Sequence, residues 1–347
     1  MTIVMKKRFS MNTKKAVSGN AAVPGDNGGE PPLECRVVKS IISANDAGKS
    51  LLELLTGRFS YHSFSEWRTI IDRGLITLNG VKAFPEAILT KGDILEYHVA
   101  DIAEPEVDAS YAVLYEDADI LAVDKSGDLP CHPAGPFYRN TLWFILKKRY
   151  GEVFPVNRLD RETSGIVLWA KNSSAASLLA AQLASMRKRY VALVHGKFTK
   201  EIDASGFLER DNASIVRKKR CFVYNDSGSG QRAETLLRPV WWNEKYSLVE
   251  ALPRTGRLHQ IRATLCSLGF PLVGDKLYGI DDTFYLKIKD DLFTAEERAA
   301  LLLPRQALHA AGLEFKHPRS GDVIHLESPV PAEFSTFRQI GDIVGEE

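Results

Sequence analysis

The stretch that organises this chain is Asn157–Gly165, which reads NRLDRETSG. The apolar runs around it predict a strand over Val156–Leu159 and a second strand over Ile166–Ala170. Between them we expect a polar loop that ends at the glycine. Asp160 then follows the end of a strand, where a rigid scaffold presents a side chain to an open loop. This carboxylate is therefore the first candidate for chemistry.

Two arginines, Arg158 and Arg161, flank Asp160 in the sequence. Nearby cations favour the charged form of a carboxylate, so we expect Asp160 to stay ionised. An ionised carboxylate in an open loop can serve as a nucleophile or as a base. The alternative is a surface turn held by salt bridges, and these residues alone favour that alternative.

A second distinctive stretch, Arg254–Arg262, reads RTGRLHQIR and opens a helix predicted over Leu258–Ser267. Helix N-termini and arginines both suit phosphate groups. The alternative for His259 is a packed, hydrogen-bonded histidine. Arg262 either pairs with a carboxylate or faces solvent.

A third stretch, Arg187–Tyr190, places three cations before an aromatic residue that begins a strand. Cations beside an aromatic ring suit phosphate contacts next to a stacked base. The alternative is the end of a helix predicted over Ser173–Arg187, whose cations match the helix dipole while Tyr190 packs in the core.

The region from Arg187 to Arg238 carries 12 Lys/Arg against 6 Asp/Glu, which modestly favours RNA binding.

The composition of the chain limits the number of domains and the kinds of partner and site that we expect. The chain has 347 residues and a formal net charge of +1, and its length suits two domains. A balanced charge neither indicates nor excludes a nucleic-acid partner. The four cysteines form no C-x-x-C pair, so neither a zinc site nor a redox pair is expected. No apolar run is long enough to span a bilayer and no secretory signal is evident, so we expect a cytoplasmic protein without a membrane partner.

The sequence predicts a small N-terminal domain of helices followed by strands. It places helices around Leu51–Leu55 and over Phe64–Asp72, then a hairpin around Asn79–Gly80 and a last strand over Ile94–Val99. The expected organisation is a disordered tail, a small domain, a linker and a large domain, at residues 1–34, 35–100, 101–110 and 111–340.

The large domain shows many short strands and few helices. Asn140 is predicted to cap a helix that runs to Tyr150, and Gly269 to close the helix after the second stretch. This order indicates an α+β class with a mixed, mainly antiparallel sheet. The remaining predicted strands are 112–115, 120–123, 190–194, 216–224, 233–240, 247–252, 307–315 and 323–326.

Several of these stretches together resemble the RluA-type pseudouridine synthases. The family signature is His-Arg-Leu-Asp-x-x-Thr-Ser-Gly, and the chain differs from it only at Asn157. A second motif, a basic residue and tyrosine that begin a strand, resembles Lys188–Gly196. A third motif, Thr-Gly-Arg-x-His-Gln-Ile-Arg, is present in full at Thr255–Arg262. Gly274–Gly279 and Leu308–Ala310 also resemble family segments. Residues 35–100 more weakly resemble the S-four-type RNA-binding domain of ribosomal proteins.

The resemblance implies an enzyme that isomerises uridine to pseudouridine in RNA, without cofactor or metal. It implies that Asp160 is the catalytic aspartate, that Tyr190 stacks on the target base, and that Arg262 pairs with the aspartate. Large-subunit ribosomal RNA is the expected substrate, transfer RNA stays an alternative, and a monomer is expected. The residues expected to contact RNA are Arg158, Arg161, Arg187, Lys188, Arg189, Arg257, His259 and Gln260.

The chain departs from the family pattern at three places. Asn157 stands where histidine is usual, Ala263-Thr264 replaces a frequent Val-His, and residues 280–304 form an insertion. Two other functions stay open. One is a non-catalytic RNA-binding or ribosome-assembly protein on the same fold. The other is a glycoside hydrolase, which needs a second carboxylate such as Glu162.

Overall fold

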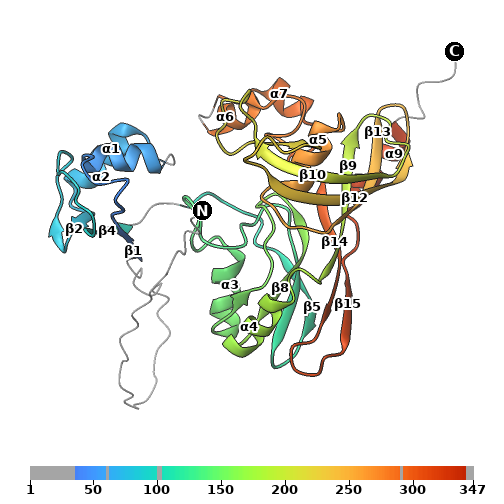
Figure 1. The fold of residues 1–347 in the computed structure, drawn as a ribbon, viewed down its shortest axis with the longest axis horizontal. Coiled ribbons are helices and arrows are strands. Elements are labelled where there is room, and N and C mark those ends of the chain that lie inside the picture. The colour runs from blue at the N-terminus through green and yellow to red at the C-terminus, as the bar shows by residue number, and fades with distance from the viewer. Residues whose placement is uncertain (1–35, 60–61, 100–103, 290–291, 341–347) are drawn as a thin grey trace, which may run out of the picture. The chain divides into compact units, whose positions relative to one another are not determined.

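The computed structural model describes residues 36–59, 62–99, 104–289 and 292–340 (Figure 1). Along the chain these residues divide near residue 101 into a small and a large unit, which are described separately. The predicted tail, 1–34, lies outside the described residues, and so does part of the predicted linker. Within the described ranges, every helix is too short or too polar to cross a membrane.

The small unit is an antiparallel four-stranded sheet with two helices. The strand order is β1-β4-β2-β3, and helices α1 and α2 stand between β1 and β2 in the chain. Ser63 and Glu66 form a capping box that starts α2, which buries Trp67, Ile70 and Ile71. The bounds are β1 (Arg36–Ile41), α1 (Leu51–Arg58), α2 (Phe64–Asp72), β2 (Ile76–Leu78), β3 (Val81–Lys82) and β4 (Ile94–Val99).

The hairpin between β2 and β3 turns at the predicted Asn-Gly pair. Asn79 and Gly80 both have positive φ, 53° and 81°, as a two-residue hairpin turn requires. The resemblance of this unit to the S-four-type domain stays a prediction.

The large unit is built on one mixed sheet, in the order β11-β10-β12-β13-β9-β14-β8-β6-β5, with β15 beside β14 and β7 beside β8. Every pairing is antiparallel except that of β14 with β8. The predicted mixed, mainly antiparallel sheet is confirmed. The strands are β5 (Tyr111–Glu116), β6 (Ile120–Lys125), β7 (Phe154–Pro155), β8 (Ser164–Ala170), β9 (Arg187–His195), β10 (Ile202–Arg210), β11 (Arg220–Val223), β12 (Gln231–Trp242), β13 (Tyr246–Pro253), β14 (Leu308–Lys316) and β15 (Val323–Glu327).

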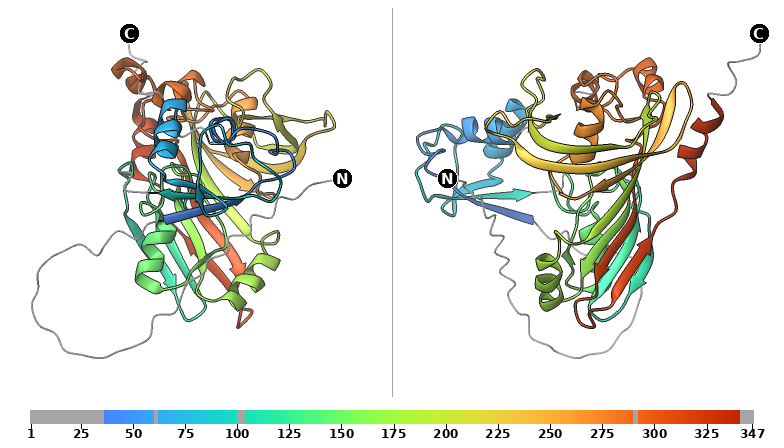
Figure 2. Two further views of the ribbon diagram at one scale, coloured as in Figure 1. Left: turned by 90° about the vertical axis from the view of Figure 1, so that its left-hand side faces the viewer. Right: turned by 45° about the vertical axis from the view of Figure 1, so that its right-hand side comes forward.

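Helices pack at both ends of this sheet. In Figures 1 and 2, α3 and α4 lie at the β8 end, and α5, α6 and α7 lie at the β10 end. Strand β6 is buried on both faces, since Ile120 and Ala122 join one apolar cluster while Leu121 and Val123 join another. The helices are α3 (Leu142–Tyr150), α4 (Ser173–Ala181), α5 (Gln260–Ser267), α6 (Thr283–Lys289), α7 (Ala295–Ala300), α8 (Ala332–Ser335) and α9 (Phe337–Ile340).

The strand predicted over Val156–Leu159 is wrong. β7 ends at Pro155, and the chain then forms a loop up to β8. In this loop the Asn157 side chain makes hydrogen bonds to the backbone of β8. Its Oδ1 accepts from the Leu168 N–H at 2.7 Å and its Nδ2 donates to the Ile166 carbonyl at 3.2 Å. The departure from the family's histidine therefore fixes the loop against β8.

The helix predicted over Ser173–Arg187 is too long. α4 ends at Ala181, and Arg187 already belongs to β9, which pairs with both β13 and β14. The reading of Arg187, Lys188 and Arg189 as the cationic end of a helix is therefore wrong. The cap of α3 also differs from the prediction by one residue, since Thr141 rather than Asn140 caps this helix. Asn172 caps α4.

Candidate active site

Asp160 lies in the loop between β7 and β8, next to the parallel junction of β8 with β14. At that junction Gly165 has φ of +109°, and an added Cβ would lie 2.3 Å from the Ala310 carbonyl oxygen. The two strands can approach this closely only because this residue is glycine. The glycine of the signature thus fixes where the aspartate loop enters the sheet.

A buried lysine supports the loop from inside the protein. Lys125, at the end of β6, is 1% exposed, and its Nζ donates to the carbonyls of Arg161 at 3.0 Å and Ser126 at 2.7 Å. Burial lowers the pKa of Lys125 from 10.5 to about 8. The carbonyl next to Asp160 is therefore held by a side chain that solvent does not reach.

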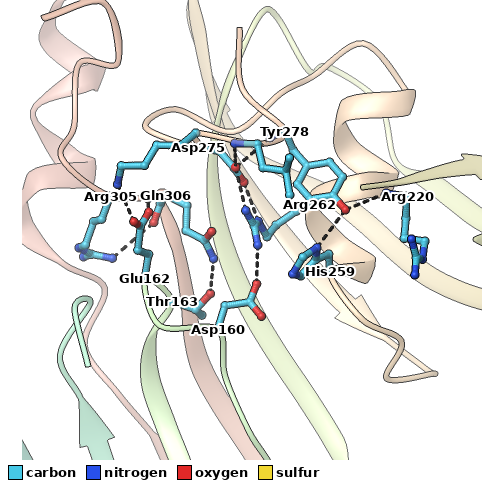
Figure 3. Close-up of polar contacts among 12 residues, drawn as sticks. Asp160, Glu162, Thr163, Arg220, His259, Arg262, Asp275, Tyr278, Arg305 and Gln306 are labelled. Carbon is cyan, nitrogen blue, oxygen red and sulfur yellow. Dashed lines mark hydrogen bonds and ion pairs between the residues drawn. The ribbon is translucent and has the colours of Figure 1, made fainter. Parts of the chain in front are cut away.

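Arg262 bridges two carboxylates (Figure 3). Its Nη1 donates to Asp160 Oδ2 at 2.7 Å, while its Nε and Nη2 donate to the two oxygens of Asp275 at 2.6 and 2.8 Å. Asp275 is fully buried and also accepts the backbone N–H groups of Leu277 and Tyr278. The guanidinium is therefore fixed on one edge by Asp275 and presents its other edge to Asp160.

The charges of this group are strongly coupled. Burial raises the pKa of Asp160, but the charge and hydrogen bond of Arg262, together with smaller effects of His259 and Gln306, outweigh burial and hold that pKa below its usual range. The same opposition holds for Asp275, whose pKa is lowered by Arg262 despite complete burial. Both carboxylates are therefore ionised at neutral pH. Arg262, rather than the two arginines that flank Asp160 in sequence, is the cation responsible.

His259 has a left-handed backbone, with φ of +56°, immediately before α5. Its Nδ1 lies 3.0 Å from the Tyr278 hydroxyl, and that hydroxyl accepts the Arg220 N–H at 3.0 Å. Burial and Arg262 lower the pKa of His259 to about 4, so the ring is neutral. When the Tyr278 hydroxyl donates to Nδ1, the proton of the neutral histidine lies on Nε2.

Tyr190 lies in β9 between β13 and β14, in register with Ala251 and Ala310. The phenol ring is half-buried and contacts the apolar clusters at both ends of the sheet. Burial and the charge of Asp160 raise the pKa of Tyr190, so its hydroxyl stays protonated. An uncharged ring near the Asp160 carboxylate suits stacking on a base.

Most residues expected to contact RNA are exposed or half-buried cations, and several are already paired. Arg158 lies 3.1 Å from His132, Arg161 pairs with Asp128, and Arg187 and Arg189 pair with Glu314 and Glu327. Lys188 is half-buried, and the Arg257 guanidinium is exposed while its Nε donates to the Arg232 carbonyl.

The expectation for Gln260 is corrected. This side chain is 4% exposed, and its amide bonds to Thr255, Thr235 and the Glu234 carbonyl. It holds the Thr255–Arg262 loop on β12, so it positions the loop from inside.

The sequence motifs did not point to two residues of the site, Asp275 and Lys125. The segment Gly274–Gly279, which contains Asp275, resembles a family segment and could have indicated this aspartate. The resemblance, however, gave Asp275 no role. Glu162, the second carboxylate that a glycoside hydrolase needs, is paired with Lys276 at 2.6 Å.

A trio of possible metal ligands, Asp117, Asp119 and His317, lies elsewhere. Arg319 already supplies positive charge there, through hydrogen bonds of 2.5 and 2.7 Å to Asp119.

Comparisons with known proteins agree with this geometry. Residues 119–267 match the RNA pseudouridylate synthase family. Ribosomal large subunit pseudouridine synthase D of Xanthomonas campestris is 31% identical over 317 residues, which cover 87% of this chain and 92% of that protein. The mitochondrial tRNA pseudouridine(32) synthase of Saccharomyces cerevisiae is 30% identical over 240 residues, 68% of this chain and only 52% of the yeast protein.

Among solved structures, human RNA pseudouridylate synthase domain containing 1 shares the fold. It has a TM-score of 0.50 and 24% identity, and the match covers 65% of this chain and 86% of the human chain. The ordered motifs, the sheet and the long match to the Xanthomonas protein lead to one conclusion. The chain belongs to the RNA pseudouridylate synthase family of isomerases.

Proposed function

We propose that this chain isomerises specific uridines of large-subunit ribosomal RNA, with Asp160 as the catalytic group. The observation that carries the proposal is the ionised Asp160 carboxylate, held by Arg262 at 2.7 Å and 31% exposed at its side chain. Its partner Arg262 is only 10% exposed, and the second partner of that arginine, Asp275, is fully buried. Asp160 is therefore both charged and open to a substrate.

The chemistry needs these groups in this arrangement. The target uridine has to leave its stack to reach a carboxylate inside a protein. The uracil then separates from ribose C1′, rotates and rejoins through carbon. An ionised Asp160 serves whether the carboxylate attacks the sugar or removes a ribose proton. Tyr190 supports the detached base by stacking, and Arg262 keeps Asp160 charged and oriented.

The choice of ribosomal RNA as substrate is supported by how much of each relative's length aligns with this chain. The Xanthomonas relative, whose name gives the ribosomal large subunit, aligns over nearly its whole length. The yeast relative, whose name gives transfer RNA, aligns over about half of its length. Transfer RNA is the second candidate. We further propose a monomer, since the loop, the strand and the helix that carry the three proposed catalytic residues all come from one chain. A cytoplasmic location stays a prediction from the sequence.

Substitution of Asp160 tests the proposal. Asp160→Asn keeps the shape and removes the charge, so we expect turnover to fall by at least about 10³-fold while RNA binding changes little. Purified protein is assayed on uridine-labelled transcripts by carbodiimide labelling and primer extension. Glu162→Gln is the matched control, because Glu162 is a second ion-paired carboxylate of the same loop. Unchanged turnover in Asp160→Asn would contradict the assignment.

The same mapping identifies the substrate. Ribosomal and transfer RNA are compared between cells with and without the chain, and a lost site that wild type restores and Asp160→Asn does not restore names the target. A site lost only from transfer RNA favours the second candidate. RNA binding without turnover on any transcript would favour the non-catalytic function.

A further inference from the structure

The outer face of α3 carries a groove that the catalytic group does not use. It has a volume of about 440 Å³ and is lined by Tyr111, Arg139, Phe144, Ile145, Lys148 and Arg149. Sites for small molecules and single nucleotides have volumes of roughly 300–1,000 Å³. The lining contains three cations, two aromatic rings and no carboxylate.

The charges of this groove are not neutralised from within. Among the described residues, no carboxylate forms an ion pair with Arg139, Lys148 or Arg149, in contrast to Arg187, which pairs with Glu314. Arg149 makes a neutral contact instead, through Nη1 and the Tyr111 hydroxyl at 3.3 Å.

The dipole of α3 explains only part of this charge. Lys148 and Arg149 lie in the last turn of the helix, where cations are favourable. Arg139 precedes the Thr141 cap at the opposite end, where a cation is unfavourable. The Glu104 carboxylate offsets the dipole at that end, since it accepts the backbone N–H groups of Tyr138, Arg139 and Asn140 at 2.8 Å, but among the described residues it forms no ion pair with the Arg139 guanidinium.

The groove lies one helix away from the catalytic loop. The opposite face of α3 buries Leu142 and Leu146 in the same apolar cluster as Leu159, the neighbour of Asp160. An α-helix with its side chains is about 10 Å across. Arg161, beside Asp160 and paired with Asp128, lies over the ring of Phe137 at 5.4 Å, two residues before Arg139, so the catalytic loop contacts the segment that leads into the groove.

We infer that this groove, hereafter the α3 groove, binds the single-stranded RNA that flanks the target uridine. Arg139, Lys148 and Arg149 contact its phosphates, and the rings of Tyr111 and Phe144 support unstacked bases. This pairing of a cationic track with aromatic rings is what single-stranded nucleic acid requires. The inference rests on the proposed function, since it assigns a second contact to the same substrate.

The test measures how RNA binding depends on salt. The variant Arg139→Gln/Lys148→Gln/Arg149→Gln is compared with a control that replaces three exposed lysines elsewhere on the large unit, Lys197→Gln/Lys200→Gln/Lys245→Gln. Each full-length protein is titrated with a fluorescent, mixed-sequence single-stranded RNA over a range of salt. We expect the slope of log K against log salt to fall in magnitude by about 2 in the groove variant, since each of the three lost phosphate contacts contributes roughly 0.7 on a single strand. The control slope should stay near wild type.

Two outcomes would overturn the inference. One is an unchanged slope in the groove variant, which would leave the groove to a protein partner. The other is an equal fall in both variants, which would reduce the effect to net charge. Thermal unfolding of both variants confirms that they are folded.

Turnover separates this inference from the proposed function. On a short stem–loop transcript that carries a mapped site, the groove variant should keep the wild-type kcat, and on a longer transcript it should show a raised KM. Absence of turnover in wild type itself would instead refute the proposed function, while the salt slopes would still report on the groove.

Discussion

Arg262 divides its contacts between two carboxylates of different exposure. Asp275, which is fully buried, takes two of its nitrogens, and Asp160, which a substrate can reach, takes one. Asp275→Asn should therefore destabilise the protein by roughly 3–5 kcal/mol, because the buried Arg262 loses the charged partner of two of its nitrogens and keeps only the contact with Asp160. Turnover should also fall, since the guanidinium is no longer aligned. Urea unfolding and the uridine assay measure the two effects.

The matched control for this prediction is Asp203→Asn. Asp203 accepts a similar forked contact from Arg254, but both side chains are about half exposed. Exposed pairs contribute little, so the control should change the free energy of unfolding by less than about 1 kcal/mol. Equal effects of the two substitutions would contradict the role given to burial.

Lys125 makes stability depend on pH in a defined direction. Its pKa is about 8 in the folded chain and near 10.5 when exposed. Between these values the unfolded chain binds more protons, so this lysine raises the free energy of unfolding as pH rises. Wild type should therefore gain stability relative to Lys125→Met between pH about 8 and about 10. Urea unfolding at several pH values tests this, and parallel curves would refute it.

The sequence identified Asp160, His259 and Arg262 because each lies in a motif. It could not identify the Asp275 contact, since nothing local shows which carboxylate will meet Arg262 once the chain folds. Gln260 was assigned wrongly for a related reason. A polar residue in a basic loop looks exposed until the folded chain shows what covers it.

At the scale of elements, the parallel contact of β8 with β14 places the aspartate loop. Gly165→Ala would put a methyl group against the Ala310 carbonyl and force a side chain into a left-handed backbone. We expect a loss of at least about 2 kcal/mol in the free energy of unfolding, together with reduced turnover. Urea unfolding measures the first effect. Gly228→Ala is the control, since Gly228 also has positive φ but open space around it. Equal losses would show that backbone strain alone is responsible.

The periodicity of apolar residues predicted most of the strands. It failed where the inward-facing residues are small, and where pairing with other strands decides whether a segment is a helix or a strand. β10 was missed because its inward positions include Ala204 and Gly206, which give little hydrophobic signal. α4 was extended too far because Leu183 and Met186 continue the helical pattern, although the following residues pair as β9. Such pairings depend on strands distant in sequence, which a local window does not contain.

At the scale of the whole molecule, the large unit carries every residue of the proposed catalytic group and its own apolar clusters. A truncated chain that begins at Glu104 should therefore fold and keep the wild-type kcat on a short transcript. Its KM on long RNA should rise if the small unit contributes to binding. Steady-state assays of both chains on both substrates test this, and an abolished kcat would contradict it.

The division into two domains was within reach of the sequence, because length and the acidic, proline-containing segment before residue 110 indicate it. The α3 groove was not, since its cations come from a loop and a helix end and its aromatic rings from two different elements. Net charge averaged over the chain conceals such a cluster.

The arginine clamp has an electrostatic consequence for what the free site admits. Two carboxylates against one guanidinium leave one net negative charge within the clamp, which the neutral His259 does not cancel and which the buried Lys125 offsets only from beneath the loop. A phosphodiester is repelled by this negative potential, whereas an uncharged uracil is not. We therefore expect the site to disfavour the RNA backbone and to favour a base that has been turned away from it, in the manner of a charge filter.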